Sequence, residues 1–254
     1  MPRDIELPTI SVVIATYNRP KSLQRLLDNL AGQHFFRFQD LDVCIVDDGS
    51  DVRGELKTPP PLVPDQVRYI YRERHPKNWP RPYSSRNTGV EHTKGEVLLF
   101  LDDDLILHNH ALRRIQDYHG LWQDIVLMPH IANLANKQYF TQWFPTRRDG
   151  EAGWIALCGV SVQRKHYEAV GGFDPIFETG MMGFADQDLG LRLFKEAGCE
   201  PVLAGDIPVL IDDREQPSWR TIFVKRWVEE HPDAEWHING PLLWDKHPEL
   251  DRRK

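Results

Sequence analysis

Short apolar runs alternate with polar stops along the first part of the chain. The runs at 9–16 and 41–46 are rich in β-branched residues and are predicted to be strands that end in polar residues at 17–20 and 47–50. Between them, Pro20 opens a helix whose buried face consists of four leucines at helical spacing, Leu23, Leu26, Leu27 and Leu30. A strand, a helix and a second strand in this order predict a parallel sheet, and ligands bind at the carboxyl edge of such sheets.

A third apolar run, at 97–105, reads VLLFLDDDL and leads directly into Asp102, Asp103 and Asp104. Its length predicts a buried parallel strand. Three carboxylates beside a hydrophobic core cost free energy unless a positive charge compensates them. A divalent cation that carries a phosphate ester would do so, because hard cations prefer carboxylate oxygens. An exposed acidic turn is the alternative interpretation.

The remaining pattern predicts further strands and helices of an α/β fold. Strands are expected at 67–71, 124–129, 154–162 with an interruption at Gly159, 202–204 and 207–211. Helices are expected at 83–93, entered through Ser84 or Ser85, and at 111–119, 165–170 and 186–197. No repeat or long linker divides the chain. We therefore expect one domain over 1–212 and a tryptophan-rich helical extension over 213–254, packed on that domain.

Composition narrows the class of protein. The chain has 254 residues, of which 41% are hydrophobic and 27% are charged, as in an ordinary globular protein. The net charge of −7 argues against general nucleic-acid binding. Its three cysteines lack metal-ligand spacing and are expected to be reduced thiols, and no apolar run is long enough to cross a membrane. These features predict a soluble cytoplasmic protein, with peripheral membrane contact left open.

Four polar clusters are expected to converge on one edge of the sheet: 17–19, 47–48, 86–87 and 102–104. An acidic side chain at a strand end can bind a base or ribose, an arginine can hold a diphosphate bidentately, and aspartates can hold a metal. Together they predict a site for a nucleotide diphosphate. Taken singly, 47–50 could be an acidic β-turn and 86–89 part of an ordinary capped helix.

The ordered motifs ATYNRP, VDDGS, SRNTGV, FLDDD, GGFDPIF and FADQDLGLRL make residues 9–212 resemble family 2 glycosyltransferases. The resemblance implies the GT-A fold: an α/β protein with a Rossmann-like, mostly parallel central sheet flanked by helices. It also implies inverting transfer of a sugar from a nucleotide-diphospho-sugar, with uridine the expected base, to a carbohydrate or other hydroxyl acceptor.

The resemblance further implies roles for individual residues. Ala15 and Tyr17 would border the base, and Asp48 would accept its ring N–H. Arg86 would face the diphosphate, and Asp102 and Asp103 would lie on the ribose side. Asp104 would bind Mn²⁺ or Mg²⁺. The residues expected around the nucleotide are therefore Ala15, Tyr17, Arg19, Asp48, Arg86, Asp102 and Asp103, and those expected around the metal are Asp104 and Asp102.

Asp186 is the expected catalytic base. An acceptor hydroxyl is a poor nucleophile near neutral pH, so a carboxylate must take its proton during attack. The family usually has a Glu-Asp pair where this chain has Ala185 and Asp186. Asp188 is the competing base, because helical positions two apart point in different directions and only one can face the acceptor. Helix capping is the alternative role for Asp186.

Other assignments stay open at the level of sequence. Asp212 or His237 could supply a third metal ligand, and Trp79, Trp143 or Trp154 could stack on a sugar or simply pack in the core. ATYNRP lacks the glycine-rich loop of a nucleotidyltransferase, and the aspartates come too late for an aspartyl phosphatase. The missing glutamate at Ala185 leaves a non-catalytic sugar-nucleotide-binding protein as the alternative function.

Overall fold

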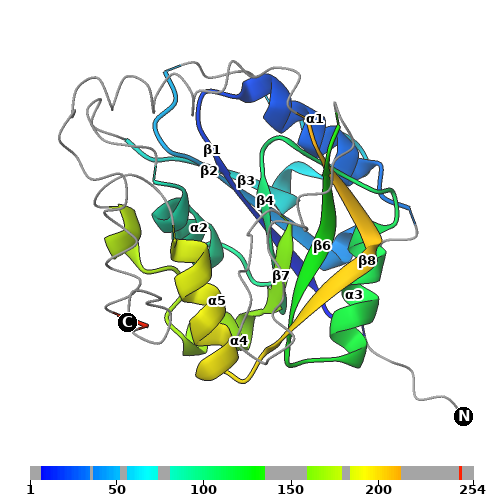
Figure 1. The fold of residues 1–254 in the computed structure, drawn as a ribbon. Coiled ribbons are helices and arrows are strands. Elements are labelled where there is room, and N and C mark those ends of the chain that lie inside the picture. The colour runs from blue at the N-terminus through cyan, green and yellow to red at the C-terminus, as the bar shows by residue number, and fades with distance from the viewer. Residues whose placement is uncertain are drawn as a thin grey trace, which may run out of the picture.

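The computed structural model describes residues 7–34, 37–51, 56–73, 81–134, 159–178, 184–212 and 246–247. Within these residues the centre is an eight-stranded sheet with the order β3-β2-β1-β4-β7-β6-β8-β5 (Figure 1). Its strands are β1 Ile10–Thr16, β2 Leu41–Asp47, β3 Val67–Tyr71, β4 Val97–Asp102, β5 Leu105–Leu107, β6 Ile125–Asn133, β7 Val160–Gln163 and β8 Glu200–Ile211.

Strand direction divides the sheet into two parts. β3, β2, β1 and β4 are all parallel, as the strand–helix–strand pattern predicted. β7 runs antiparallel to both β4 and β6, β6 and β8 are parallel, and β5 is antiparallel to β8. The parallel part therefore brings the carboxyl ends of β1, β2 and β4 to one edge, where the predicted polar clusters lie.

Helices cover both faces of the sheet (Figure 1). They are α1 Pro20–Ala31, α2 Pro82–Glu91, α3 Ala111–Leu121, α4 Arg164–Ala169 and α5 Ala185–Lys195, with short 3-10 helices at Phe38–Asp40, Pro64–Gln66 and Pro175–Glu178. Side chains of α1 and α3 share one core with Val12 and Ile14 of β1. Side chains of α2, α4 and α5 share the other with Val13. The alternating direction of strand side chains explains this split.

The helices form where the sequence predicts them, with small changes at their ends. Pro20 is in the first turn of α1, and all four predicted leucines are buried. α5 buries Leu189, Leu191 and Leu193, whereas Phe194 is only partly buried, and Gly198 follows α5 in a left-handed conformation. α2 begins at Pro82 instead of Ser84 or Ser85, because proline suits the first turn of a helix. A helix entered through Ser84 or Ser85 would place Arg86 in its first turn, but α2 begins earlier and Arg86 lies in the second turn.

Two strand predictions need correction. The run at 97–105 is not one strand: β4 ends at Asp102, Asp103 and Asp104 form a turn, and β5 begins at Leu105 and pairs with β8. The predicted strands at 202–204 and 207–211 are a single strand, β8, whose register against β6 shifts beside Pro129 and His130. In both cases pairing with a strand far away in the sequence determines where the strands begin and end.

Gly159 explains why the strand predicted over 154–162 is interrupted. Its φ is +78°, and a Cβ at this position would lie 2.9 Å from the Pro129 side chain. β7 begins directly after it, and 154–158 lie outside the described residues. Both the backbone conformation and the close approach therefore require glycine.

Other sequence predictions concern the cysteines, the membrane and the tail. Cys44 and Cys199 are buried free thiols, and burial raises the pKa of each to about 11, so neither is a reactive thiolate. In the part of the chain that the structure describes, no helix has the length and apolar character needed to cross a bilayer. Cys158 and the tail tryptophans lie outside the described residues, as does the 213–254 extension except for residues 246–247.

Candidate functional site

The ends of β1, β2 and β4 gather the predicted polar clusters. In the strand register Ala15 is opposite both Val46 and Asp102, and Thr16 is opposite Asp47. The residues that follow each strand therefore emerge side by side. Ala15 and Tyr17 are both partly buried at this edge. The sheet thus brings together the residues expected to surround a nucleotide.

Arg19 neutralises two of the three consecutive aspartates. Its Nη1 donates to Asp103 Oδ1 at 3.0 Å and to Asp104 Oδ2 at 2.8 Å. The Thr16 hydroxyl donates to Asp103 Oδ2 at 2.6 Å. Burial raises the pKa of Asp103 to about 7, and Arg19 is the largest influence in the opposite direction. The positive charge predicted beside the aspartates is thus supplied by the chain itself.

Arg86 pairs with the remaining aspartate of the triplet. Its Nη2 donates to Asp102 Oδ1, and its guanidinium lies 5.9 Å from the ring centroids of both Tyr83 and Phe173. Arg86 is 5% exposed, whereas Asp102 is partly exposed, so the pair meets solvent on the aspartate side. Two packed rings fix the plane of the guanidinium. The guanidinium expected to face a diphosphate is therefore held in one orientation at the sheet edge.

Asp186 lies in the first turn of α5, near this pair. Its Oδ1 is shut off from solvent and has no hydrogen-bond partner among the described residues. Burial raises the pKa of the carboxyl above its ordinary value, and the charge of Arg86 is the largest opposing influence. The N-cap of α5 is Phe184, so Asp186 is not the capping residue. A buried polar atom without a partner is costly. This oxygen is therefore available to a polar group of a bound substrate.

Asp188, the competing base, is fully engaged in ion pairs. It is 0% exposed, and its Oδ2 accepts hydrogen bonds from Arg192 Nε at 2.9 Å and Nη2 at 2.6 Å. Its Oδ1 lies 2.7 Å from Lys246 Nζ and 3.1 Å from His247 Nε2. Burial acts to raise the pKa of Asp188, but these bonds outweigh it and hold the pKa below its usual range. Such a carboxylate is a poor proton acceptor.

Asp48 and Glu178 bind the start of α2. Asp48 accepts the backbone N–H of Arg81 at 2.6 Å, and Glu178 Oε1 accepts the N–H groups of Tyr83 and Ser84, each at 2.9 Å. Sequence reasoning missed Glu178, which immediately follows the GGFDPIF motif. The N–H groups at the beginning of α2 are therefore bonded to carboxylates of the chain.

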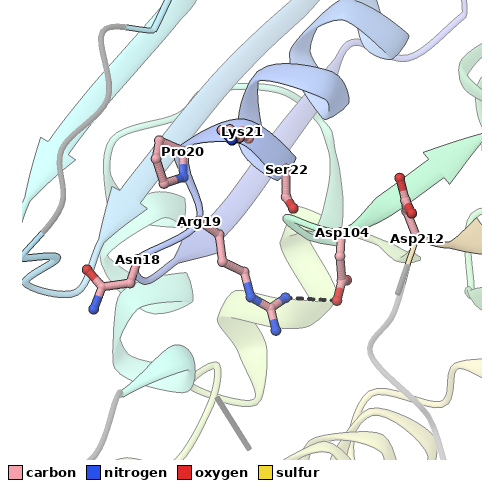
Figure 2. A pocket seen from close by; sticks show the side chains of 7 residues that line it. All are labelled: Asn18, Arg19, Pro20, Lys21, Ser22, Asp104 and Asp212. Carbon is pink, nitrogen blue, oxygen red and sulfur yellow. Dashed lines mark hydrogen bonds and ion pairs between the residues drawn. The ribbon is translucent and has the colours of Figure 1, made fainter. Parts of the chain in front are cut away.

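A pocket of about 200 Å³ opens at the start of α1 beside the aspartates. Its lining residues are Asn18, Arg19, Pro20, Lys21, Ser22, Asp104 and Asp212 (Figure 2). The backbone N–H of Asp212 donates to the carbonyl of Asp104 at 2.7 Å, and the Asp212 carboxylate lies 3.3 Å from Arg25 Nε. Among the described residues, no side-chain hydrogen bond caps the start of α1 at its N-cap, Arg19. The pocket thus combines two carboxylates with uncapped helix N–H groups and Lys21.

These residues fit a cation shared with a phosphate better than a cation held by protein alone. Within the described residues, no three His, Cys, Asp or Glu side chains are grouped closely enough to hold a metal. Asp104 and Asp212 do line one pocket, whereas Asp102 faces Arg86. Mg²⁺ and similar ions often use one or two carboxylates and complete their shell with water and substrate phosphates. His237, Trp79, Trp143 and Trp154 lie outside the described residues.

Comparison with known proteins identifies the class. The model of the family described as glycosyl transferase family 2 matches residues 11–153, more than half of the chain. The chain therefore belongs to glycosyltransferase family 2. The matched residues include β1, β2 and β4 with all three aspartates of the triplet.

Individual relatives agree with this assignment. The glycosyltransferase AglE of Haloferax volcanii is 30% identical over 122 residues, which are 47% of this chain and 38% of AglE. The poly(ribitol-phosphate) β-N-acetylglucosaminyltransferase TarP of Staphylococcus aureus is 30% identical over 109 residues, 43% of this chain and 32% of TarP. The validoxylamine A glucosyltransferase of Streptomyces hygroscopicus is 25% identical across 96% of this chain and 62% of its own. The chain spans about a third of the first two relatives.

A solved structure confirms the fold. The crystal structure of S. aureus TarS 1–349 superposes with a TM-score of 0.61 at 17% identity, and the match covers 82% of this chain and 61% of that one. The mixed sheet with helices on both faces is thus the GT-A architecture expected from the sequence motifs.

Proposed function

We propose that this protein transfers a sugar from a UDP-sugar to an acceptor hydroxyl with inversion at the anomeric carbon. The observation that carries the proposal is the partly buried Asp186 carboxylate, which lies beside the Arg86–Asp102 pair and whose Oδ1 is shut off from solvent and has no partner among the described residues. Structures of TarS in complex with UDP and with UDP-GlcNAc support a uridine donor. The names of TarP and of the validoxylamine A glucosyltransferase support sugar transfer.

The donor would bind along the carboxyl ends of β1, β2 and β4. Asp48 and Tyr17 would meet the base, and Asp102 and Asp103 would lie toward the ribose. Arg86 would turn from Asp102 toward the diphosphate, since a guanidinium binds phosphate oxygens bidentately. Mn²⁺ or Mg²⁺, held by Asp104 with Asp212 or Asp102, would supply positive charge against the leaving diphosphate.

Asp186 would act as general base. As the acceptor oxygen forms its bond to the anomeric carbon, the bond from that carbon to the diphosphate oxygen breaks and the hydroxyl proton passes to Asp186. A carboxyl with a raised pKa is the better proton acceptor for this step. Ala185, which replaces the family's glutamate, is buried in the core and has no proton-accepting group. Asp186 would therefore be the general base of this pair. The expected cytoplasmic location belongs to the same proposal.

The test compares Asp186→Asn with the parent protein. Asparagine keeps the shape but cannot take a proton, so transfer should fall by roughly 10²- to 10⁴-fold. UDP affinity, measured by calorimetry, should stay within about twofold of the parent value. Asp206→Asn, at an exposed position on β8, is the matched control. A variant with full transfer activity would refute the role of Asp186.

A ligand panel tests the donor class. UDP should raise the unfolding temperature more than other nucleoside diphosphates, and Mn²⁺ should increase the shift, because a ligand that binds only the native state stabilises it. No shift with any nucleotide would refute the site. If the parent protein binds UDP yet never turns over a donor with any acceptor, the alternative of a non-catalytic sugar-nucleotide-binding protein is correct.

A further inference from the structure

Residues Lys246 and His247, from the far C-terminal end of the chain, lie against α5. Lys246 Nζ is 2.7 Å from Asp188 Oδ1, and His247 Nε2 is 3.1 Å from the same oxygen. His247 is buried, and Asp188 is inaccessible to solvent. Two consecutive residues, 59 positions beyond Asp188 at His247, therefore complete the hydrogen bonding of a carboxylate inside the domain.

Lys246 also binds the other end of the segment that contains the proposed base. Its Nζ is 2.9 Å from Asp174 Oδ2, and it lies 5.4 Å from the ring centroid of Phe177. Asp174 precedes the 3-10 helix Pro175–Glu178, and Asp188 is in the first turn of α5. One ammonium group thus joins the two ends of the 174–188 segment, which includes Asp186.

The backbone of Asp188 links this ion pair to the turn on which Asp186 is placed. The Asp188 N–H donates to the carbonyl of Phe184 at 2.9 Å, which is the first helical hydrogen bond of α5. Phe184 has a φ of +68°, a left-handed conformation that is uncommon for a phenylalanine. Such a conformation persists only where its surroundings determine it. The position of Asp186 therefore depends on how firmly Asp188 is held.

The two oxygens of Asp188 have separate partners. Arg192, in the same helix, binds Oδ2, whereas Lys246 and His247 bind Oδ1. Arg192 also donates from Nη1 to the carbonyl of Val170, so it ties α5 to the end of α4. Its bonds to Asp188 stay within α5 and do not reach Asp174. Among the described residues, the side-chain contacts that reach Asp188 from outside α5 come from Lys246 and His247.

We propose that Lys246 and His247 are positioning residues that hold the first turn of α5, and with it the Asp186 carboxylate, in the geometry required for proton transfer. The inference rests on the proposed function of Asp186. It extends the catalytic unit beyond residues 11–153, which match the family model, to the C-terminal end of the chain.

The test uses the full chain with Lys246→Met, and Lys165→Met is the matched control. Both lysines are partly exposed and pair with an aspartate, but Lys165 lies on α4 and pairs with Asp124 at 3.6 Å. Lys246→Met should lower kcat at least about tenfold, with the donor KM and the UDP affinity within about twofold of the parent values. Lys246→Arg, which keeps the charge and its donors, should restore most of kcat.

Three results would overturn the proposal. The first is an unchanged kcat in Lys246→Met and in the double variant Lys246→Met with His247→Leu. The second is a parallel loss of kcat and UDP affinity, which would indicate general damage to the fold. The third is a failure of Lys246→Arg to recover activity. If Lys246→Met does not fold, Lys246→Gln, which retains a donor, is judged by the same criteria.

The outcome separates this proposal from the proposed function. If the parent enzyme transfers sugar and Asp186→Asn abolishes transfer, but Lys246→Met is fully active, only the positioning role fails. If the parent protein transfers no sugar at all, the proposed function itself fails.

Discussion

His119 gives the domain a defined dependence of stability on pH. The side chain is 1% exposed between α3 and β7, and its Nε2 lies 2.9 Å from the hydroxyl oxygen of Ser161. Its Nδ1 is buried and has no hydrogen-bond partner among the described residues. Burial is the main cause that lowers the pKa of His119 to about 4, and the nearby His166 acts in the same direction. The native state therefore keeps this imidazole neutral.

The sign and size of the effect follow from the two pKa values. The unfolded chain binds a proton at His119 below pH 6.5, whereas the folded chain does so only near pH 4. This contribution to stability is therefore complete above pH 6.5 and is lost as the pH falls. The loss is about 2 kcal/mol at pH 5 and about 3 kcal/mol at pH 4. Losses of this size are a large share of the stability of a typical domain.

The assay is urea unfolding of the parent protein and of His119→Gln at about pH 7.5 and pH 5. Glutamine cannot titrate, so the decrease in unfolding free energy between these pH values should be smaller in the variant by about 2 kcal/mol. His108→Gln, at an exposed position before α3, controls for the loss of a histidine. An equal decrease in His119→Gln and the parent protein would refute the reasoning.

Two further predictions concern the site and the core. Arg19→Met should increase the affinity for Mn²⁺ in the absence of nucleotide by roughly tenfold in calorimetry, because it removes the cation that pairs with Asp104; an unchanged affinity would show that Arg19 does not compete with the metal. Gly89→Ala should lower the unfolding free energy by about 1–3 kcal/mol in urea, since its Cβ would lie 2.5 Å from Val13 Cγ1. Gly205→Ala, with open space around the added methyl, should cost far less, and equal losses would contradict this account.

The parallel half of the fold was predictable because local pattern decides it. Buried leucines at helical spacing fixed the face of α1, and polar residues after apolar runs marked the ends of β1 and β2. Parallel pairing then required the carboxyl ends to lie together. The convergence of Arg19, Asp48, Arg86 and the aspartate triplet follows from these few features.

The rest depends on contacts between residues far apart in the sequence. Nothing local distinguishes Leu105 from the apolar residues of β4, and only pairing with β8 makes it part of a separate strand. Glu178 caps α2 across more than ninety residues. The sequence left Asp188 as the competing base, and only the contacts of Lys246 and His247 show that its carboxylate is already paired. Such long-range ion pairs leave no periodic signal.

The charges around Asp102, Asp103 and Asp104 change the role expected of a metal ion. The sequence argument required a positive charge beside Asp102, Asp103 and Asp104, and a divalent cation was the predicted source. Arg86 and Arg19 already provide that charge within the chain. The fold therefore does not need a cation to compensate these carboxylates. A cation that binds Asp104 must compete with Arg19, and a diphosphate would attract the displaced guanidinium, so binding of cation and donor should be mutually reinforcing.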